Sequence, residues 1–144
     1  MKRLLFLISI SFLLTDCKKK EGDSGTTPSP NSAVNGKWKY ESNINGGCSN
    51  LIGTVCEIKN GESTILSLPA TENGFKTGEK ILSNINQTTS PNNFSAIGYT
   101  RNNGGVVQDP NLKVEIVIQA NGQEMIQTYP NNACNPNQKW IKMN

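Results

Sequence analysis

A strict alternation of apolar and polar residues near the C-terminal end constrains the fold more than any other feature of this chain. Between residues 112 and 120, mostly polar residues alternate with the apolar residues Leu112, Val114, Ile116, Ile118 and Ala120. Side chains two residues apart lie on the same face of a β-strand, so this period of two predicts a half-buried strand. No window of ten or more residues after Leu14 has the period of an amphipathic helix. The sequence therefore predicts an all-β domain.

A hairpin follows this strand. Asn121-Gly122 separates it from residues 123–129, and Asn-Gly favours a two-residue type I′ turn because both central residues need φ > 0. Such a turn pairs Ile118 with Met125, Ile116 with Gln127 and Val114 with Tyr129. The six side chains then share one face and are candidates for the lining of a ligand cavity or for a solid core: Val114, Ile116, Ile118, Met125, Gln127 and Tyr129.

A second Asn-Gly, at residues 60 and 61, joins the strands predicted at 54–59 and 62–68. It pairs Cys56 with Ile65 and Ile58 with Ser63. Apolar residues also fall on the opposite face of this hairpin, which requires a bulge or apolar contact on both faces. Four further strands are predicted at 37–42, 79–87, 94–101 and 139–143.

Eight short strands with mostly hairpin-length connections in residues 36–144 predict an eight-stranded antiparallel up-and-down β-barrel, with a β-sandwich as the alternative. Closing the sheet removes the exposed edge strands that would promote aggregation. The segment has the length of one domain with one core.

The N-terminus has the layout of an export signal. Lys2 and Arg3 precede an apolar run at residues 4–14, which is shorter than the roughly 20 residues that span a bilayer. Leu14-Thr15-Asp16-Cys17 resembles the lipobox of bacterial lipoproteins, although Asp16 stands where that family usually has Gly, Ala or Ser. The resemblance implies that residues 1–16 are a lipoprotein signal peptide and that Cys17 is lipidated. An uncleaved anchor or a simple secreted protein is the alternative.

Residues 17–35 would then form the lipidated cysteine and a disordered tether, because they are charged or rich in Ser, Thr, Pro and Gly. The lipoprotein resemblance places the chain in the bacterial cell envelope, outside the cytoplasm. Its acyl anchor would bind a lipid membrane, at the outer membrane or the periplasmic face.

Two short motifs indicate a family for the barrel. Gly36-Lys37-Trp38 is similar to the Gly-x-Trp signature of the lipocalins, and the stretch from Lys139 through Trp140 to Lys142 resembles the last strand of bacterial lipocalin-like lipoproteins. The resemblance implies a lipocalin-like (calycin) barrel in which Trp38 seals the base under a basic residue of the last strand. Lys139 and Lys142 are both candidates for that cation. Plain core packing is the alternative role of the two tryptophans.

The cysteines constrain the loops. If Cys17 is lipidated, Cys48, Cys56 and Cys134 remain, and thiols tend to oxidise outside the cytoplasm. In an up-and-down barrel Cys48 and Cys134 fall in loops at the same end of adjacent strands. We therefore expect a Cys48–Cys134 disulfide, with Cys56 as a buried free thiol. Pairing of Cys48 with Cys56 is the alternative, and two disulfides are expected if Cys17 is not lipidated.

Composition excludes several classes of function. The chain has no histidine, which excludes Ser-His-Asp and Cys-His catalysis and most catalytic zinc sites. The sequence therefore predicts neither enzyme nor metal site nor cofactor. Residues 36–144 carry nine basic and eight acidic side chains, without the concentrated basic face that binds nucleic acid.

Two functions remain. The first, which the lipocalin resemblance implies, is a module that binds a small apolar or amphipathic ligand in the barrel mouth. The second is an envelope interaction or inhibitor-type barrel without a ligand cavity, which presents Asn-rich loops near residues 45–53, 86–93 and 101–111 to a protein partner. A cavity at the end that bears Cys48 and Cys134 would favour the first. A packed interior with an ordered, protruding loop would favour the second.

Overall fold

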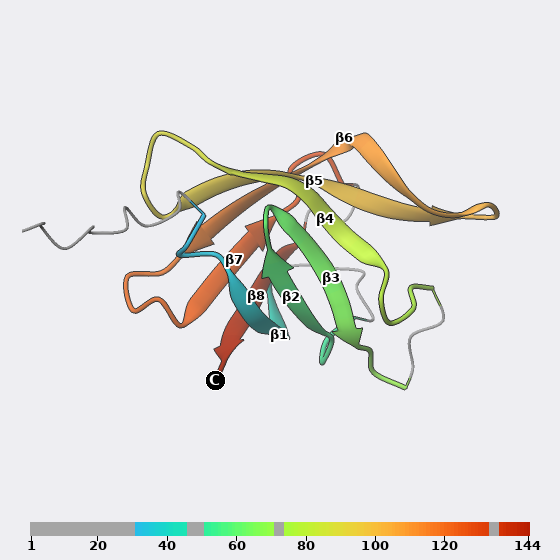
Figure 1. Ribbon diagram of the computed structural model, residues 1–144, viewed down its shortest axis with the longest axis horizontal. Helices are drawn as coiled ribbons and strands as arrows, with labels where there is room; N and C mark the ends of the chain where they lie inside the picture. The colour runs from blue at the N-terminus through green and yellow to red at the C-terminus, as the bar shows by residue number, and fades with distance from the viewer. Residues whose placement is uncertain (1–30, 46–50, 71–73, 133–135) are drawn as a thin grey trace, which may run out of the picture.

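Successive β-strands make up almost all of the regular structure (Figure 1). The computed structural model describes residues 31–45, 51–70, 74–132 and 136–144, and these residues contain no helix. The strands are β1 (Gly36–Asn45), β2 (Val55–Lys59), β3 (Glu62–Ser67), β4 (Lys80–Gln87), β5 (Asn93–Asn102), β6 (Gly105–Ile118), β7 (Glu124–Thr128) and β8 (Asn137–Met143).

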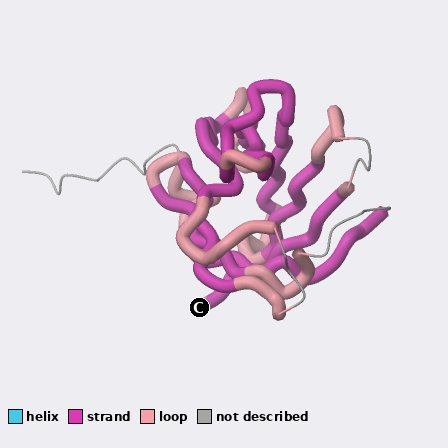
Figure 2. The backbone as a smooth tube through the Cα atoms, turned by 90° about the vertical axis from the view of Figure 1, so that its right-hand side faces the viewer, coloured by secondary structure: helices cyan, strands magenta, loops and turns pink. Residues whose placement is uncertain are grey.

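The strands close into a barrel. Each pairs antiparallel with the next along the chain, and β8 returns to pair with β1, where Trp38 lies opposite Lys142 and Tyr40 opposite Trp140. Figure 2 shows the strands wrapping around a common interior. The predicted eight-stranded up-and-down barrel is confirmed, and the sandwich alternative is wrong.

The first Asn-Gly hairpin has its predicted register and turn. Cys56 lies opposite Ile65, and the ladder shifts register between Val55 and Cys56. A bulge was one of the two expected ways to accommodate apolar residues on both faces. Asn60 and Gly61 have φ of 54° and 78°, so both central residues adopt the left-handed conformation that a type I′ turn needs.

The second Asn-Gly hairpin has the predicted register but a different turn. Ile118 lies opposite Met125 and Ile116 opposite Gln127. Only Gly122 of the Asn-Gly pair has positive φ, and Gln119 N–H donates to Glu124 O at 2.9 Å. The loop is therefore wider than the predicted two-residue type I′ turn.

The predicted pairing of Val114 with Tyr129 is wrong. The ladder between β6 and β7 ends where Glu115 lies opposite Thr128. Pro130, which has no N–H to donate, follows Tyr129. Tyr129 is thus not paired with β6, and its N–H donates to Pro136 O at 3.4 Å, on the side of β8.

Strands β5 and β6 form a long hairpin that extends beyond the rest of the barrel (Figure 1). The prediction of a loop at residues 101–111 is therefore wrong, because β6 begins at Gly105. Asp109-Pro110-Asn111 resembles a turn, but it forms part of a bulge within β6, between the pairs Ile97–Lys113 and Tyr99–Gln108.

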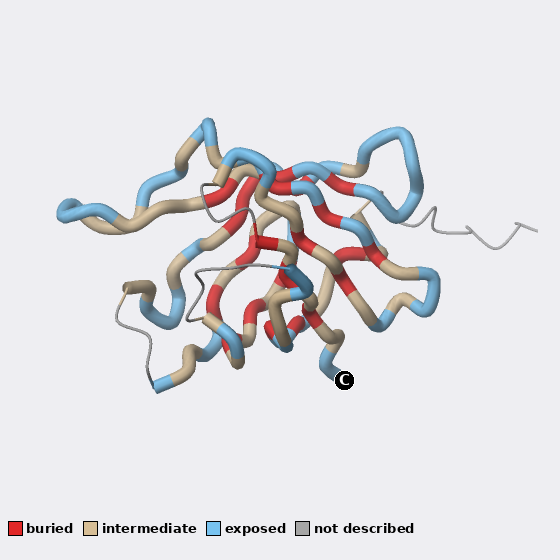
Figure 3. The backbone as a smooth tube through the Cα atoms, turned by 180° about the vertical axis from the view of Figure 1, so that it is seen from behind, coloured by how far each residue is buried: buried red, intermediate tan, exposed pale blue. Residues whose placement is uncertain are grey.

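The interior is packed toward one end of the barrel. Figure 3 shows buried segments gathered inside and exposed turns at the ends. The core combines residues from seven strands with one residue that precedes β1: Val34, Trp38, Tyr40, Cys56, Ile58, Leu82, Ile85, Phe94, Ala96, Val114, Ile116, Ile118, Met125 and Trp140.

The domain begins earlier than Gly36. Val34 is fully buried in the core, and its carbonyl accepts a hydrogen bond of 2.8 Å from Trp38 Nε1. Asn31 Nδ2 donates to Ile85 O at 3.0 Å. Residues 31–35 therefore belong to the barrel, and the prediction that the disordered tether extends to residue 35 is wrong for them.

Several sequence predictions lie outside the described residues. These are the signal peptide, the tether as far as residue 30, the lipidation site Cys17 and the Cys48–Cys134 disulfide, and they stay predictions. Cys56 is described and is a buried free thiol, as expected. Burial raises its pKa to about 12, although the neighbouring Ser63 hydroxyl opposes part of that shift.

Candidate functional site

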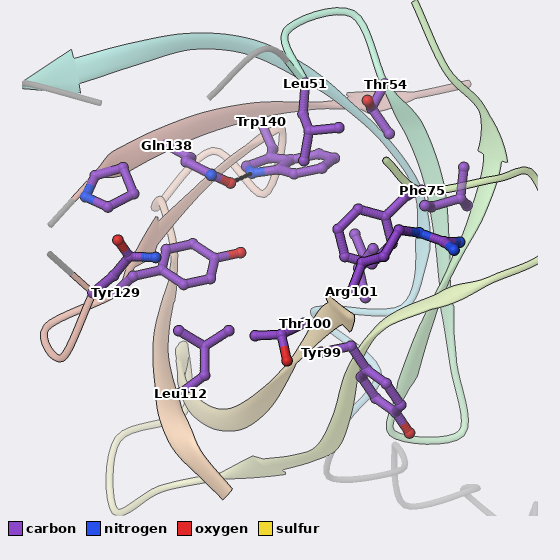
Figure 4. A pocket seen from close by; sticks show the side chains of 14 residues that line it. Leu51, Thr54, Phe75, Tyr99, Thr100, Arg101, Leu112, Tyr129, Gln138 and Trp140 are labelled. Carbon is purple, nitrogen blue, oxygen red and sulfur yellow. Dashed lines mark hydrogen bonds between the residues drawn. The ribbon is translucent and has the colours of Figure 1, made fainter. Parts of the chain in front are cut away.

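A cavity of about 320 Å³ lies at one end of the barrel (Figure 4). This end, the mouth, carries the connections β1–β2, β3–β4 and β7–β8 and the projecting part of β5–β6. It is the end at which the predicted loops of Cys48 and Cys134 begin and end. The lining residues are Leu51, Thr54, Ile65, Phe75, Ile81, Tyr99, Thr100, Arg101, Leu112, Tyr129, Asn132, Pro136, Gln138 and Trp140.

Aromatic and aliphatic side chains form most of the cavity wall. Trp140 stacks on Tyr40 with ring centroids 5.0 Å apart and planes 14° from parallel, and its Nε1 donates to Gln138 Oε1 at 3.1 Å. The Trp140 ring is thus held both by a face and by its polar edge. Figure 4 shows Trp140, Tyr129, Leu112 and Phe75 arranged around a common space.

The bulge in β6 shapes this wall. A Cβ placed on Gly98 would lie 2.5 Å from Leu112 Cδ2. The Leu112 side chain therefore occupies the space that a side chain at position 98 would need. Real Cβ atoms do not approach so closely. Gly98 therefore lets Leu112 fold inward to line the cavity.

Arg101 is the only charged side chain among the described residues that line the cavity. Its Nη2 donates to both carboxylate oxygens of Glu79, and its guanidinium lies 6.0 Å from the ring centroid of Phe75. The hydrogen bond from Arg101 holds the pKa of Glu79 below its usual range. Glu79 is therefore ionised at neutral pH, and the pair carries no net charge.

Two polar atoms of lining residues have no hydrogen-bond partner among the described residues. One is Arg101 Nε, which is buried; Nη2 of the same side chain is hydrogen-bonded to Glu79. The other is Oγ1 of Thr54, a residue that is 1% exposed and directly precedes β2. A buried polar group without a partner is destabilising, and such groups in native proteins call for an explanation.

Tyr129 contributes a further polar group to the cavity lining. Its hydroxyl donates to Gln127 Oε1 at 3.0 Å. Burial raises the pKa of this hydroxyl above its usual range, so Tyr129 stays protonated and keeps that donor.

The sequence-predicted ligand residues separate into two groups. Tyr129 lines the cavity. The other five, buried in the interior, are absent from its lining and belong to the packed part of the barrel: Val114, Ile116, Ile118, Met125 and Gln127. The alternation located the interior correctly, but it does not distinguish a hollow layer from a filled one.

Several lining residues, including Thr54, Phe75 and Arg101, were not among the sequence candidates. They lie at strand ends or in connections far apart in sequence, and only closure of the barrel brings them together. The sequence did indicate which connections lie together, because alternate connections of an up-and-down barrel are at the same end. It did not indicate which of their side chains line the cavity.

The opposite end, the base, is sealed by Trp38. This residue is fully buried, and Lys142 Nζ lies 5.3 Å from its ring centroid. The cation over Trp38 is therefore Lys142. Lys139 instead contacts Glu41 and Glu124 at 3.2 and 3.6 Å.

Gly36 and Trp140 have different roles from each other. Gly36 has φ of 129°, and a Cβ there would lie 3.2 Å from Lys142 Cε, so glycine suits both the backbone and the passing lysine. Trp140 lies one inward-facing position before Lys142 on β8 and lines the cavity, so it belongs to the mouth and not to the base.

A second hollow of similar volume lies outside β1 and β8 and is lined by Lys39, Tyr40, Glu41, Ile52, Gly53, Ile141 and Met143. Within the described part of the chain, no unpaired buried polar atom borders it. The cavity at the mouth is therefore the stronger candidate site.

The described residues contain no cluster of three or more potential metal-ligating His, Cys, Asp or Glu side chains. They also contain no helix long and apolar enough to cross a bilayer.

No protein-family model matches the chain, and neither the curated proteins nor the solved structures include a significant match.

Proposed function

We propose that this chain is a membrane-tethered, extracytoplasmic lipoprotein of the bacterial lipocalin-like type, which binds a small hydrophobic ligand in the mouth of its barrel. The observation that carries the proposal is the mostly apolar cavity of about 320 Å³ at the end opposite the sealed base. Ligand pockets are typically concave and apolar, with a few polar groups and volumes of roughly 300 to 1,000 Å³.

The cavity volume sets the size of the ligand. An apolar cavity of about 150 Å³ binds benzene. The mouth cavity has about twice that volume, which suits a molecule of about two rings or a short acyl chain. Removal of its apolar surface from water would supply most of the affinity.

The base supports the family resemblance. Lys142, from the last strand, lies over Trp38 of the Gly-x-Trp motif, which is the arrangement that the resemblance implies. The lipobox-like residues before Cys17 support export and tethering in the bacterial envelope.

Native mass spectrometry of residues 30–144, combined with uptake of a fluorescent hydrophobic probe, tests the binding function. We expect a bound small molecule or probe binding in the micromolar range. Thr100→Trp, which fills the cavity, should abolish both. Thr128→Trp is the matched control, because Thr128 faces outward on β7. A protein that takes up no probe would refute the binding function.

A protein–protein role is the second candidate, and the projecting β5–β6 hairpin favours it. Val107, near the hairpin tip, is 43% exposed. If the hairpin binds an envelope protein, Val107→Asp should abolish cross-linking to that protein in intact cells. Val117→Asp should not, because Val117 is 38% exposed on the same strand but lies within the barrel wall. Equal cross-linking of both variants would refute the hairpin as the binding surface.

A further inference from the structure

We propose that the outer part of the β5–β6 hairpin is a hinged flap, and that the Arg101–Glu79 ion pair holds it closed against the mouth cavity. The closed flap would limit the rates at which ligand enters and leaves. The flap is defined as residues 99–108. This inference rests on the proposed ligand-binding function and concerns the regulation of that same cavity.

The two strands of the flap pair only with each other among the described residues. The β4–β5 ladder ends at Gly98, and the β6–β7 ladder ends at Glu115, so both stop before the flap. Residues 99–102 pair with residues 105–108. Figure 1 shows this part of the hairpin projecting past the other strands. A two-stranded hairpin is marginally stable by itself, so the position of the flap depends on its other contacts.

A hinge lies where the flap joins the barrel. The β5–β6 ladder is interrupted there, at Gly98 on β5 and at residues 109–112 on β6. Glycine restricts the backbone least, and a bulge disrupts the ladder and bends the strand. Both strands of the hairpin are therefore irregular at the same level, and rotation at this level would move the flap as a unit.

The flap supplies part of the cavity wall. Tyr99, Thr100 and Arg101 belong to it and line the cavity, whereas Trp140 lines the cavity from β8. Figure 4 shows Thr100 across the space from Trp140. Rotation of the flap would therefore separate one wall from the other and widen the mouth.

Two side-chain contacts hold the flap to the barrel. Arg101 Nη2 donates to both carboxylate oxygens of Glu79, the residue directly before β4. Gln108 Nε2 donates to Ser83 Oγ on β4 at 2.7 Å. Each contact joins one strand of the flap to the β4 segment, across a gap that the β4–β5 ladder does not bridge.

Glu79 is the fixed side of the ion pair. Its carboxylate accepts a hydrogen bond of 2.6 Å from Lys76 N–H, and its carbonyl accepts one of 2.9 Å from Ile65 N–H on β3. The Arg101 and Glu79 side chains are 26% and 25% exposed, so water reaches the pair. Partly exposed ion pairs are modest in strength, and this one can therefore break and form again.

A flap of this kind has a kinetic signature. If ligand passes only through the open state, the association and dissociation rate constants both scale with the open population. A weaker closure then raises both by the same factor and leaves Kd unchanged. A residue that contacts the ligand instead changes Kd, chiefly through the dissociation rate.

Stopped-flow binding of 2-(dimethylamino)-6-propionylnaphthalene, a neutral two-ring fluorophore, tests the flap in the full-length protein in a non-ionic detergent. Energy transfer from tryptophan reports binding, and the slope and intercept of rate against probe concentration give the two rate constants. One detergent concentration for all variants cancels probe uptake by micelles from the ratios.

Glu79→Gln should raise both rate constants about fivefold, with Kd within about twofold of wild type. Glu79 is not among the cavity-lining residues. Ser83→Ala, which removes the acceptor for Gln108, should raise both about threefold. Glu62→Gln is the matched control, because it breaks the exposed Lys80–Glu62 ion pair away from the flap, and it should change neither rate.

Backbone ¹⁵N relaxation dispersion of the same protein without ligand measures the motion independently. We expect conformational exchange to be concentrated in residues 98–112 and to be about fivefold larger in Glu79→Gln than in wild type. Residues of the packed core, such as Ile116 and Met125, should show no such increase.

The outcomes separate the flap from the binding function. Unchanged rates in Glu79→Gln, a change confined to dissociation, or an equal change in Glu62→Gln would overturn the flap while leaving ligand binding intact. No uptake of the probe by the wild-type protein would overturn the binding function. Relaxation dispersion would then decide the hinge alone, and an absence of exchange in residues 99–108 of Glu79→Gln would overturn it.

Discussion

At the residue scale, the Thr54 hydroxyl lowers the stability of the folded protein. It is buried with no partner among the described residues, and an unmade hydrogen bond at a buried group costs about 1 to 3 kcal/mol. A residue chosen for stability alone would be valine, which has the same shape.

Thr54→Val should therefore stabilise the ligand-free protein by about 1 kcal/mol. Urea denaturation measures this as a higher midpoint with an unchanged slope. The outward-facing control Thr64→Val should stay within about 0.5 kcal/mol of wild type. A Thr54→Val protein that is less stable than wild type would show that the hydroxyl already has a structural partner.

The Arg101–Glu79 pair predicts a dependence of stability on pH. The pKa of Glu79 is lower in the folded protein than in the unfolded chain, chiefly because Arg101 donates to it. The contribution of the carboxylate is thus complete above the unfolded pKa of roughly 4.3 and is lost as pH falls through the lower folded pKa.

Glu79→Gln should consequently be less stable than wild type at pH 7, and the difference should shrink below about pH 4. Denaturation midpoints measured from pH 7 to pH 3 check this. In an Arg101→Met background the same substitution should lose most of its pH dependence; the Lys76 N–H, which donates to Glu79 Oε2 at 2.6 Å, still lowers the pKa of Glu79 there. A difference that stays constant across the range would show that the pair contributes through contact and not through charge.

At the element scale, the β5–β6 hairpin shows where sequence patterns succeed and where they fail. The registers of the hairpins at Asn60-Gly61 and Asn121-Gly122 were predictable for most of their pairs, because Asn-Gly locates the turn and the alternation decides which residues share a face. The start of β6 at Gly105 could not be predicted, because Asp109-Pro110-Asn111 has the composition of a turn. The strand absorbs these residues as a bulge, and this requires a partner that leaves room for Leu112. Gly98 provides that room.

Gly98→Ala should destabilise the protein by about 1 to 3 kcal/mol, because the new methyl group would overlap Leu112. Gly104→Ala is the matched control at the exposed tip of the same hairpin and should have little effect. Chemical denaturation of the two variants checks the difference.

The cause of that destabilisation can be separated from backbone effects. In a double-mutant cycle, Leu112→Ala should cost less in the Gly98→Ala background than in wild type, because it removes the overlap. Strict additivity of the two substitutions would contradict the contact.

At the scale of the whole molecule, the closed barrel follows from eight alternating segments with short connections, and the sequence predicted it. The alternation in the sequence did not predict that the interior would be packed at the base and hollow at the mouth. Inward residues such as Ile116 and Tyr129 obey the same period of two whether they meet another side chain or a cavity. The difference depends on how side chains from all eight strands meet, which only the three-dimensional arrangement gives.

Lipid attachment also concerns the whole molecule. If Cys17 carries acyl chains, each buried methylene contributes about 0.8 kcal/mol to membrane binding, and Cys17→Ser should move the protein from the membrane fraction to the soluble fraction. Fractionation and immunoblotting measure this, with Cys56→Ser as the matched cysteine control. Membrane association that persists in Cys17→Ser, with an unprocessed signal in both forms, would refute the tether.

The sealed base has a consequence for how such a protein would work. The chain enters the barrel at Asn31–Val34, beside Trp38 and Lys142, on the side away from the cavity. If Cys17 carries acyl chains, the membrane anchor would therefore be joined to the barrel at the end opposite the cavity. An anchor at that end allows the cavity to open away from the bilayer surface.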